Sequence, residues 1–198
     1  MAFRVETKEK KLFLTFDDGP VPEATPEVLQ ILSMSNAKAT FFCIGQNVER
    51  YPEIFRHIIK EGHAVGNHTF HHLNGWKASR EKYLDDTDQC KRVMNQEMIS
   101  TNPKPFFRPP YGKLTPFQFV ALKRKFRIVM WDVLARDWEQ HRNPQSCFAR
   151  IKNNAVPGSI VVFHDSVKAK SRMVPALQMT LNYFTEMGYS FETLEKYI

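Results

Sequence analysis

Two adjacent carboxylates follow an apolar stretch near the start of the chain. The segment KLFLTF (11–16) runs straight into Asp17 and Asp18, and a Gly-Pro pair comes next. Neighbouring side chains of a regular strand point to opposite faces, but at a strand end that leads into a turn both can reach one centre. Two carboxylates so close repel each other unless a cation or a shared proton lies between them. A simple Asp-Gly turn is the alternative interpretation.

Three histidines lie within five residues after the short apolar segment HAVG (63–66). In NHTFHH (67–72), His68 and His72 are four residues apart, so on a helical turn they would lie on one face. Imidazole nitrogens in that arrangement suit a divalent metal. His71 is the alternative second ligand. No Glu follows His68, which excludes the H-E-x-x-H pattern of metalloproteases.

Two further segments combine rigid or aromatic residues with charged ones. In FFRPPYG (106–112), two prolines stiffen a loop that would hold Arg108 and a backbone N–H in fixed positions. WDVLARDW (131–138) provides two aspartates and two tryptophans, and tryptophan commonly lines sugar-binding or apolar pockets. The competing interpretations are a rigid connector, aspartates that cap helices or lie on the surface, and a Trp131 that packs in the core.

The last such segment is SIVVFHDS (159–166), in which His164 and Asp165 end an apolar stretch. An imidazole there can exchange protons near neutral pH, although a purely structural histidine is the alternative. Together the five segments supply a metal pocket, a spare carboxylate, a spare imidazole, a fixed arginine and an aromatic wall. That set of groups matches metal-assisted hydrolysis better than any other reaction class.

The elements that must position these groups alternate between strand and helix patterns. Strands are expected at seven places, several of them continuously apolar as in strands covered on both faces: 11–16, 39–44, 63–66, 105–107, 126–131, 159–164 and 189–191. Three helices are expected where a capping side chain precedes a proline, which is well tolerated at the first helical position: these starts are Thr25-Pro26, Thr115-Pro116 and Asn143-Pro144.

Two more helices are indicated by periodicity. An apolar stripe follows Tyr51-Pro52, and Gly62 can end that helix. The longest expected helix follows Ser79, with apolar and small residues at three- and four-residue spacing up to Met98. Alternating strands and helices predict an α/β fold with a mainly parallel sheet. About seven such units could close into a small barrel resembling a TIM barrel, whose active-site face is the carboxyl end of the strands. An open doubly wound sheet is the alternative.

Length and composition set the remaining limits. The 198 residues, 42% of them hydrophobic, predict a single domain over residues 1–198. The net charge is +7, but the basic residues are scattered, so no nucleic-acid partner is expected. Three cysteines without close spacing are expected to be buried thiols. No apolar run could cross a bilayer. The polar N-terminal segment contains no signal peptide, which predicts a cytoplasmic protein, or an extracytoplasmic one if a leader has been removed.

The five segments, in this order, resemble the motifs of the polysaccharide deacetylases with the NodB homology domain, carbohydrate esterase family 4. TFDDGP, H-[ST]-x-x-H, RPPYG, a segment ending in DW and an apolar strand ending in His carry this resemblance, which extends from about Lys11 to the C-terminus. The resemblance implies a distorted (β/α)7 barrel. It also implies that the metal ligands are Asp18, His68 and His72.

The remaining roles follow from the same resemblance. Asp17 would be the catalytic base, and Arg108 would hold it in place and keep it ionised. The backbone N–H of Tyr111 would bind the oxyanion. His164 would be the catalytic acid, tuned by Asp137. The last of these residues, Trp138, would line the substrate pocket.

The sequence departs from the family pattern at two places. Leu134 stands where the family often has an aspartate, and the last motif reads Val162-Phe163-His164 where the family usually has Leu-x-His. Neither departure touches the expected ligands, acid or base. The ligand types favour one zinc ion, and cobalt, nickel or iron would also suit them.

The expected reaction removes N-acetyl groups from N-acetylglucosamine units of a polysaccharide, with peptidoglycan first and chitin-like polymers second. Three alternatives remain open from the sequence. These are a deacylase or amidohydrolase of small amides on the same fold, a non-catalytic glycan-binding module, and a glycosidase with paired carboxylates. The oligomeric state is not predicted.

Overall fold

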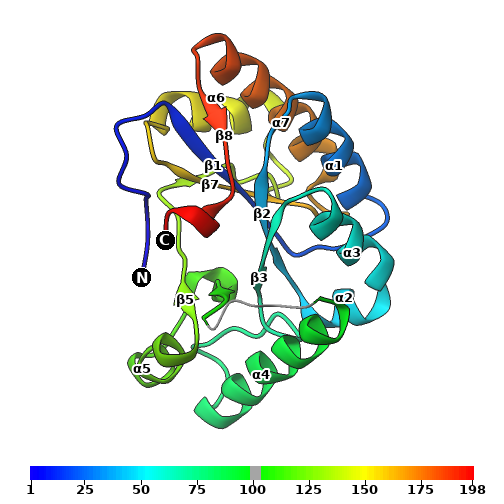
Figure 1. Ribbon diagram of the computed structural model, residues 1–198, viewed down its shortest axis with the longest axis vertical. Helices are drawn as coiled ribbons and strands as arrows, with labels where there is room; N and C mark the ends of the chain where they lie inside the picture. Colours follow the sequence, from blue (N-terminus) through cyan, green and yellow to red (C-terminus); the bar gives the residue numbers. More distant parts are fainter. Residues whose placement is uncertain (99–103) are drawn as a thin grey trace.

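The computed structural model describes residues 1–98 and 104–198, and these contain eight strands (Figure 1). The strands are β1 (Lys11–Asp17), β2 (Ala39–Cys43), β3 (Ala64–Asn67), β4 (Phe106–Phe107), β5 (Arg127–Ile128), β6 (Val133–Leu134), β7 (Ile160–His164) and β8 (Ser190–Phe191). The α-helices are α1 (Thr25–Met34), α2 (Gly45–Arg50), α3 (Pro52–Lys60), α4 (Arg80–Glu97), α5 (Pro116–Lys125), α6 (Pro144–Asn154) and α7 (Lys170–Glu186). Two short 3-10 helices, η1 (Pro110–Gly112) and η2 (Leu194–Lys196), complete the described elements.

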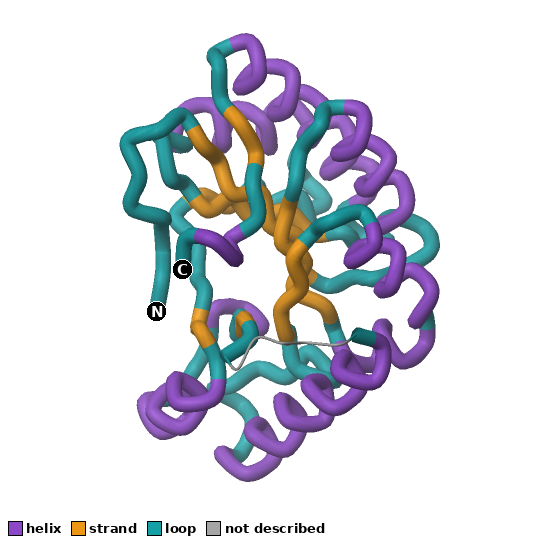
Figure 2. The backbone as a smooth tube through the Cα atoms, viewed as in Figure 1, coloured by secondary structure: helices purple, strands orange, loops and turns teal. Residues whose placement is uncertain are grey.

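The strands form one curled parallel sheet in the order β5-β4-β3-β2-β1-β7-β6, and β8 pairs with β1. Helices surround it in an arc, and both chain termini lie on the side that this arc leaves open (Figure 2). Within the described residues, the end strands β5 and β6 do not pair with each other. The predicted α/β barrel is therefore confirmed, with its distortion located between β5 and β6.

The first residues of the chain occupy this interruption of the sheet. The Ala2 N–H donates to the carbonyl of Ile128 at 3.0 Å, and the Met130 N–H donates to the Ala2 carbonyl at 2.7 Å. On the other side, the Val5 N–H donates to the carbonyl of Gly158 at 2.9 Å. The N-terminal segment thus connects the β5 end of the sheet to the loop before β7 by backbone hydrogen bonds.

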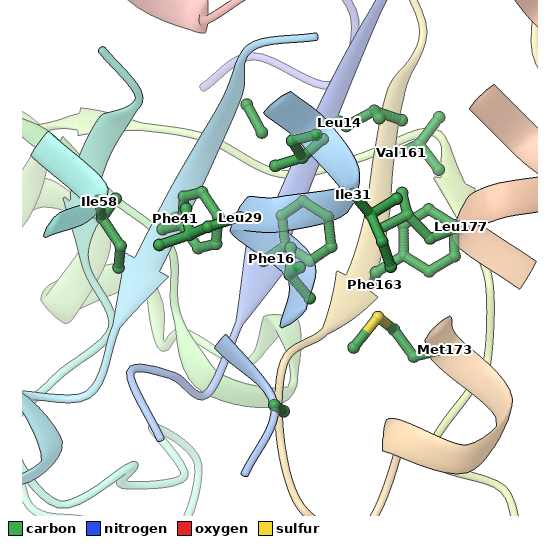
Figure 3. Close-up of a cluster of buried hydrophobic side chains, with 14 of the residues drawn as sticks. Leu14, Phe16, Leu29, Ile31, Phe41, Ile58, Val161, Phe163, Met173 and Leu177 are labelled. Carbon is green, nitrogen blue, oxygen red and sulfur yellow. The ribbon is translucent and has the colours of Figure 1, made fainter. Parts of the chain in front are cut away.

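Alternation along β1 divides its side chains between two environments. Leu14 and Phe16 belong to the apolar layer under the helices, whereas Phe13 belongs to a second cluster inside the barrel. In the outer layer, the Phe16 ring stacks between those of Phe41 and Phe163, with centroids 5.0 and 5.8 Å away (Figure 3). The same alternation puts Thr15 and Asp17 on the inner side of β1, since they share the parity of Phe13.

The predicted strands agree with the structure except in one region. The strand expected at 126–131 is only β5, and β6, which was not predicted, follows it. The reason is that the chain changes neighbours here: the Val129 N–H donates to the carbonyl of Phe107 of β4, whereas the Asp132 N–H donates to that of Ile160 of β7. The apolar run FRIVMW therefore crosses from one end of the sheet to the other, which hydrophobicity alone does not reveal.

The predicted helix caps are confirmed at two of three places. The Thr115 hydroxyl accepts a hydrogen bond from the Gln118 N–H at 3.3 Å, and the Asn143 side chain accepts one from Ser146 at 2.8 Å. At α1 the prediction is wrong, because the N-cap residue is Ala24 and Thr25 is already helical. The Thr25 hydroxyl instead donates a hydrogen bond to the carboxylate of Asp165, the residue that follows β7.

Two further predictions concern the cysteines and possible membrane-spanning segments. Cys43, Cys90 and Cys147 are all buried free thiols, as expected. In the part of the chain that the structure describes, no helix has both the length and the apolar character needed to cross a bilayer.

Candidate active site

A pocket of about 580 Å³ lies at the carboxyl ends of the strands. It receives side chains from all five segments that the sequence singles out. Its lining consists of Asp17, Asp18, His68, His72, Tyr111, Lys113, Trp131, Leu134, Trp138, Val162, His164, Ser166 and Lys168. The parallel topology explains this convergence, because the carboxyl ends of parallel strands meet at one edge of the sheet.

Three of these side chains form a group that could hold a metal ion. Ligand atoms of Asp18, His68 and His72 all lie within 4.8 Å of one another. The Nε2 atom of His72 is 3.3 Å from Asp18 Oδ1, and that of His68 is 3.9 Å from the same oxygen. Asp18 reaches this position because its backbone has a φ of 85°, which turns its side chain toward the centre instead of continuing the alternation of β1.

The hydrogen bonds around the group fit a bound cation. Asp18 Oδ1 is buried and has no hydrogen-bond partner among the described residues. The Nδ1 atom of His68 lies 2.8 Å from the carbonyl of Arg108. A carbonyl can only accept, so Nδ1 carries the proton and the lone pair of Nε2 faces Asp18. Burial lowers the pKa of His68 to about 4, which keeps its ring neutral, as a metal ligand must be.

His71, the alternative ligand, is directed elsewhere. Its Nδ1 atom is 2.6 Å from Asp86 Oδ1 on α4, and the backbone N–H groups of Phe70 and His71 both donate to Asp86 Oδ2. Asp86 therefore fixes the loop that carries His68 and His72. The sequence analysis did not single out Asp86, because its contact with the loop depends on how α4 packs.

Asp17 lies beside the three-residue group and is engaged by a buried arginine. Arg108 Nη1 donates to Asp17 Oδ1 at 2.7 Å and to the Thr15 hydroxyl at 2.7 Å. Burial by itself raises the pKa of Asp17, but the charges of Arg108 and His164 and the hydrogen bond from Arg108 hold it below its usual value. Asp17 is therefore an ionised carboxylate with one oxygen, Oδ2, free of Arg108.

The arginine is itself held from several sides. Its side chain is fully buried, Nη2 donates to the carbonyl of Met130 at 2.9 Å, and its guanidinium carbon lies 4.0 Å from the centroid of the Phe42 ring. A buried guanidinium needs such partners, because an unpaired one would cost several kcal/mol. The orientation of Asp17 is consequently set by a group that cannot itself move easily.

On the other side of β1, His164 forms a pair with Asp137. His164 Nδ1 is 2.8 Å from Asp137 Oδ1, and the His164 backbone N–H donates to Asp137 Oδ2 at 2.8 Å. Burial lowers the pKa of His164, but the Asp137 carboxylate outweighs this effect and the pKa rises to about 9. The Trp138 ring packs edge-on against the imidazole at 4.7 Å. The pair can therefore deliver a proton to the pocket at neutral pH.

Tyr111 contributes both a ring and a backbone group. Its φ of 60° and ψ of 7° lie in the left-handed region, and its ring centroid is 4.6 Å from that of His72. Within the described residues, its N–H donates to no other group. The two neighbouring prolines and this conformation leave a backbone donor available at the rim of the pocket.

The wall between Trp131 and Trp138 is apolar. Leu134 and Val162 complete it, and Leu134 is the residue that departs from the family pattern. Trp131, for which a core position was the favoured alternative, is only half-buried and lines the pocket. This wall offers an apolar surface in the same pocket as Asp17 and His164.

The two aspartates of the WDVLARDW segment have different positions. Asp132 is outside the pocket lining and accepts hydrogen bonds from Ser159, the Ile160 N–H and Arg4 at 2.8 Å each. It thus joins the N-terminal segment to the start of β7, and it is neither the helix cap nor the surface charge that were the alternatives. Asp137 is the aspartate that contacts His164.

Asp165 is a site-supporting residue whose role the sequence did not indicate. Its buried carboxylate accepts hydrogen bonds from the Gly19 N–H at 3.1 Å and from the Thr25 hydroxyl at 2.6 Å. Its own N–H donates to the carbonyl of Asp17 at 3.1 Å. One residue at the end of β7 therefore fixes the turn that carries Asp17 and Asp18. The only signal in the sequence was its place directly after His164.

Comparisons with known proteins identify relatives of the chain. The family model of polysaccharide deacetylase matches residues 4–125. A peptidoglycan-N-acetylglucosamine deacetylase of Bacillus cereus is 34% identical over 201 residues, which cover 97% of this chain and 72% of that protein. A chitooligosaccharide deacetylase of Azorhizobium caulinodans is 38% identical over 165 residues, covering 83% and 78% of the two chains.

A solved structure extends the similarity to the fold. The crystal structure of a peptidoglycan N-acetylglucosamine deacetylase in complex with a naphthalenyl N-oxidanyl-benzamide superposes with a TM-score of 0.91 at 32% identity. The match covers 99% of this chain and 91% of that one. The shared architecture therefore includes every strand end that contributes to the pocket.

Proposed function

Because the chain belongs to the polysaccharide deacetylase family, as its motifs predict, we propose that it removes N-acetyl groups from N-acetylglucosamine units of a polysaccharide and releases acetate. One observation carries the proposal. A carboxylate that is free for proton transfer, Asp17, lies beside a group able to bind metal, and His164 lies on the other side of β1. Hydrolysis of an acetamide needs a base, an electrophile and an acid in this arrangement.

The proposed cofactor is one divalent cation held by Asp18, His68 and His72. The unpartnered Asp18 oxygen and the neutral His68 ring support it. Two imidazoles and a carboxylate favour zinc, and cobalt, nickel or iron suit the same ligands. When bound, such a cation supplies Lewis acidity, which lowers the pKa of water from about 15.7 to roughly 7 and polarises a carbonyl oxygen.

Asp17 then acts as the general base. Its carboxylate takes a proton from the water that attacks the acetamide carbon, and Arg108 holds it ionised and in position for this step. Attack places negative charge on the acetamide oxygen. The Tyr111 N–H donates a hydrogen bond to that oxyanion, a contribution typically worth about 10²–10³ in rate.

His164 completes the reaction as the general acid. The departing amine must gain a proton when the carbon–nitrogen bond breaks, and the imidazolium of His164 donates it. Asp137 keeps that imidazole protonated and fixes its orientation. The acetyl methyl group packs against the wall formed by Leu134, Val162 and Trp138. The products are acetate and a free amino sugar.

Peptidoglycan is the first proposed substrate and a chitin-like polymer the second, because relatives of both kinds are similar to this chain. Acetate release should be measured from peptidoglycan, chitooligosaccharides and small amides, each with and without chelator. Release from a glycan that stops with chelator and returns with zinc is the expected result. Cleavage of small amides alone would indicate an amidohydrolase, and glycan binding without acetate release a non-catalytic module. Either result would refute the proposal.

A further inference from the structure

Two lysines line the pocket from opposite sides of the barrel. Lys113 follows η1 in the loop after β4, and Lys168 lies in the loop after β7. In the sheet order, β3, β2 and β1 lie between β4 and β7. In the other direction around the barrel, β5, the interruption and β6 lie between them. The two lysines therefore belong to opposite walls of the pocket, whose lining also includes Asp17, Asp18 and His164.

Neither lysine is neutralised in the part of the chain that the structure describes. The Lys113 ammonium group lies over the ring of Trp76, 4.8 Å from its centroid. Among the described residues, neither Lys113 nor Lys168, which both line the pocket, forms an ion pair. The pocket carboxylates are already engaged, Asp17 by Arg108 and Asp18 among the histidines. The rim of the pocket therefore keeps two positive charges without a carboxylate partner.

The position of Lys113 is supported by an anchored aromatic ring. Trp76 is 66% exposed, yet its indole N–H donates to the carbonyl of Leu114 at 3.2 Å and its backbone N–H donates to Asn74 at 3.0 Å. A ring fixed in this way attracts the ammonium group to its face. Lys113, which lines the pocket, is thus held at its ammonium end by a ring outside the pocket lining and does not extend freely into solvent.

We infer that Lys113 and Lys168 select glycans in which carboxylates flank the N-acetylglucosamine unit on both sides. The inference rests on the proposed function, since the acetamido group must reach Asp17 and His164 while the polymer continues past both walls. A neutral homopolymer presents only hydroxyl and acetamide groups to the two lysines. A polymer in which N-acetylglucosamine alternates with an acidic sugar presents an anion to each, as peptide-free peptidoglycan strands do through the lactyl carboxylates of their muramic acid units.

The first two substrates of the test share one glycan backbone and differ in the charge of the lactyl group. Peptide-free peptidoglycan glycan strands carry lactyl carboxylates, and the same strands with these groups converted to methylamides do not. Strands with intact peptides form a third arm, which separates lactyl carboxylates from peptide carboxylates as the recognised group. For the zinc-loaded wild-type protein, kcat/KM for acetate release should be about tenfold higher on the carboxylate strands than on the amidated ones, and this ratio should fall as salt screens the charges.

Variants then assign the selectivity to the two lysines. In Lys113→Met and Lys168→Met, the ratio of kcat/KM between carboxylate and amidated strands should fall about threefold each, and in the double variant it should approach one. Lys60→Met is the matched control, since Lys60 is exposed on α3, away from the pocket. It should keep the wild-type ratio.

The outcomes separate the inference from the proposed function. Equal kcat/KM on carboxylate and amidated strands in the wild type would overturn the inference and leave deacetylation intact. An equal loss of selectivity in Lys60→Met would also overturn it, because the effect would then come from net charge and not from the pocket. Absence of acetate release from every glycan, with zinc bound, would overturn both.

Discussion

Burial and charge act in opposite directions on Asp17. Burial favours the protonated acid, but Arg108 at 2.7 Å holds the pKa down, so the group can serve as a base at neutral pH. The backbone around the site is also unusual. Asp18, His72 and Tyr111 all have positive φ, which costs non-glycine residues about 1–3 kcal/mol each. The structure therefore gives up some stability to bring Asp18, His72 and the Tyr111 backbone into the same pocket.

Asp17→Asn tests whether the two adjacent carboxylates have different roles, Asp17 as the base and Asp18 as a metal ligand. Asparagine has the same shape but cannot accept a proton, so kcat should fall by about 10²–10⁴ while zinc stays bound. Acetate release and metal content of the purified variant are the measurements. Asp18→Asn is the control and should lose zinc. A variant of Asp17 that loses zinc, and recovers full specific activity on reloading, would show that the assigned roles are wrong.

The pair of His164 and Asp137 predicts the alkaline limit of activity. His164 must be protonated to act as an acid, so kcat/KM should fall as pH rises through its pKa of about 9. In Asp137→Asn the carboxylate charge that raises this pKa is gone, so the alkaline limb should move to lower pH. Both pH profiles are recorded with the same metal bound, so their difference reports Asp137. An unchanged limb would mean that another group is the acid.

For single residues, the sequence predicted the side chains that line the pocket better than the contacts that hold them in place. Residue type and spacing were enough to single out Asp17, His68 and His164, because such side chains are uncommon directly after apolar strands. The contacts of Asp165 and Asp86 were not predictable. They depend on hydrogen bonds across elements that are far apart in the sequence, which no local pattern encodes.

Among the elements, β1 and β7 act as one unit. Asp17 and His164 are partners in register on these neighbouring strands, and Asp165 connects the turn after β1 to the end of β7. Asp17 and His164, the proposed base and acid, therefore keep their relative positions through backbone pairing. Such rigid support matters because a displacement of about 1 Å can cost roughly 10²-fold in rate.

Gly19→Ala should disrupt this unit. A Cβ atom at position 19 would lie 2.0 Å from Asp165 Oδ2, so the turn or the carboxylate must move. We expect a destabilisation of about 1–3 kcal/mol and an activity loss of about 10²-fold. Thermal unfolding and acetate release measure the two effects. Gly188→Ala is the control for activity, because a Cβ there meets nothing within 4 Å; its φ of 77° should lower stability while activity stays unchanged. Equal activity of the two variants would refute the coupling.

The elements themselves were predictable where a local signal existed. Capping residues before proline located the starts of α5 and α6, and apolar runs located β1, β2 and β7. The short strand β6 was missed because its two residues have no periodicity of their own. It becomes a strand only by pairing with β7, after the chain has crossed the interruption in the sheet.

For the whole molecule, the barrel brings five distant segments to one pocket, and a metal bound there should stabilise all of them together. A ligand that binds only the folded state at 100 times its Kd adds about 2.7 kcal/mol. A chain of this size gains about 2–4 °C per kcal/mol, so zinc should raise Tm by roughly 5–10 °C over the chelated protein. Differential scanning calorimetry measures this shift. His72→Ala should remove most of it, whereas His71→Ala should retain it, since His71 contacts Asp86 and not Asp18. An identical zinc-dependent shift in His72→Ala would place the cation outside the Asp18, His68 and His72 group, and the proposed site would then be wrong.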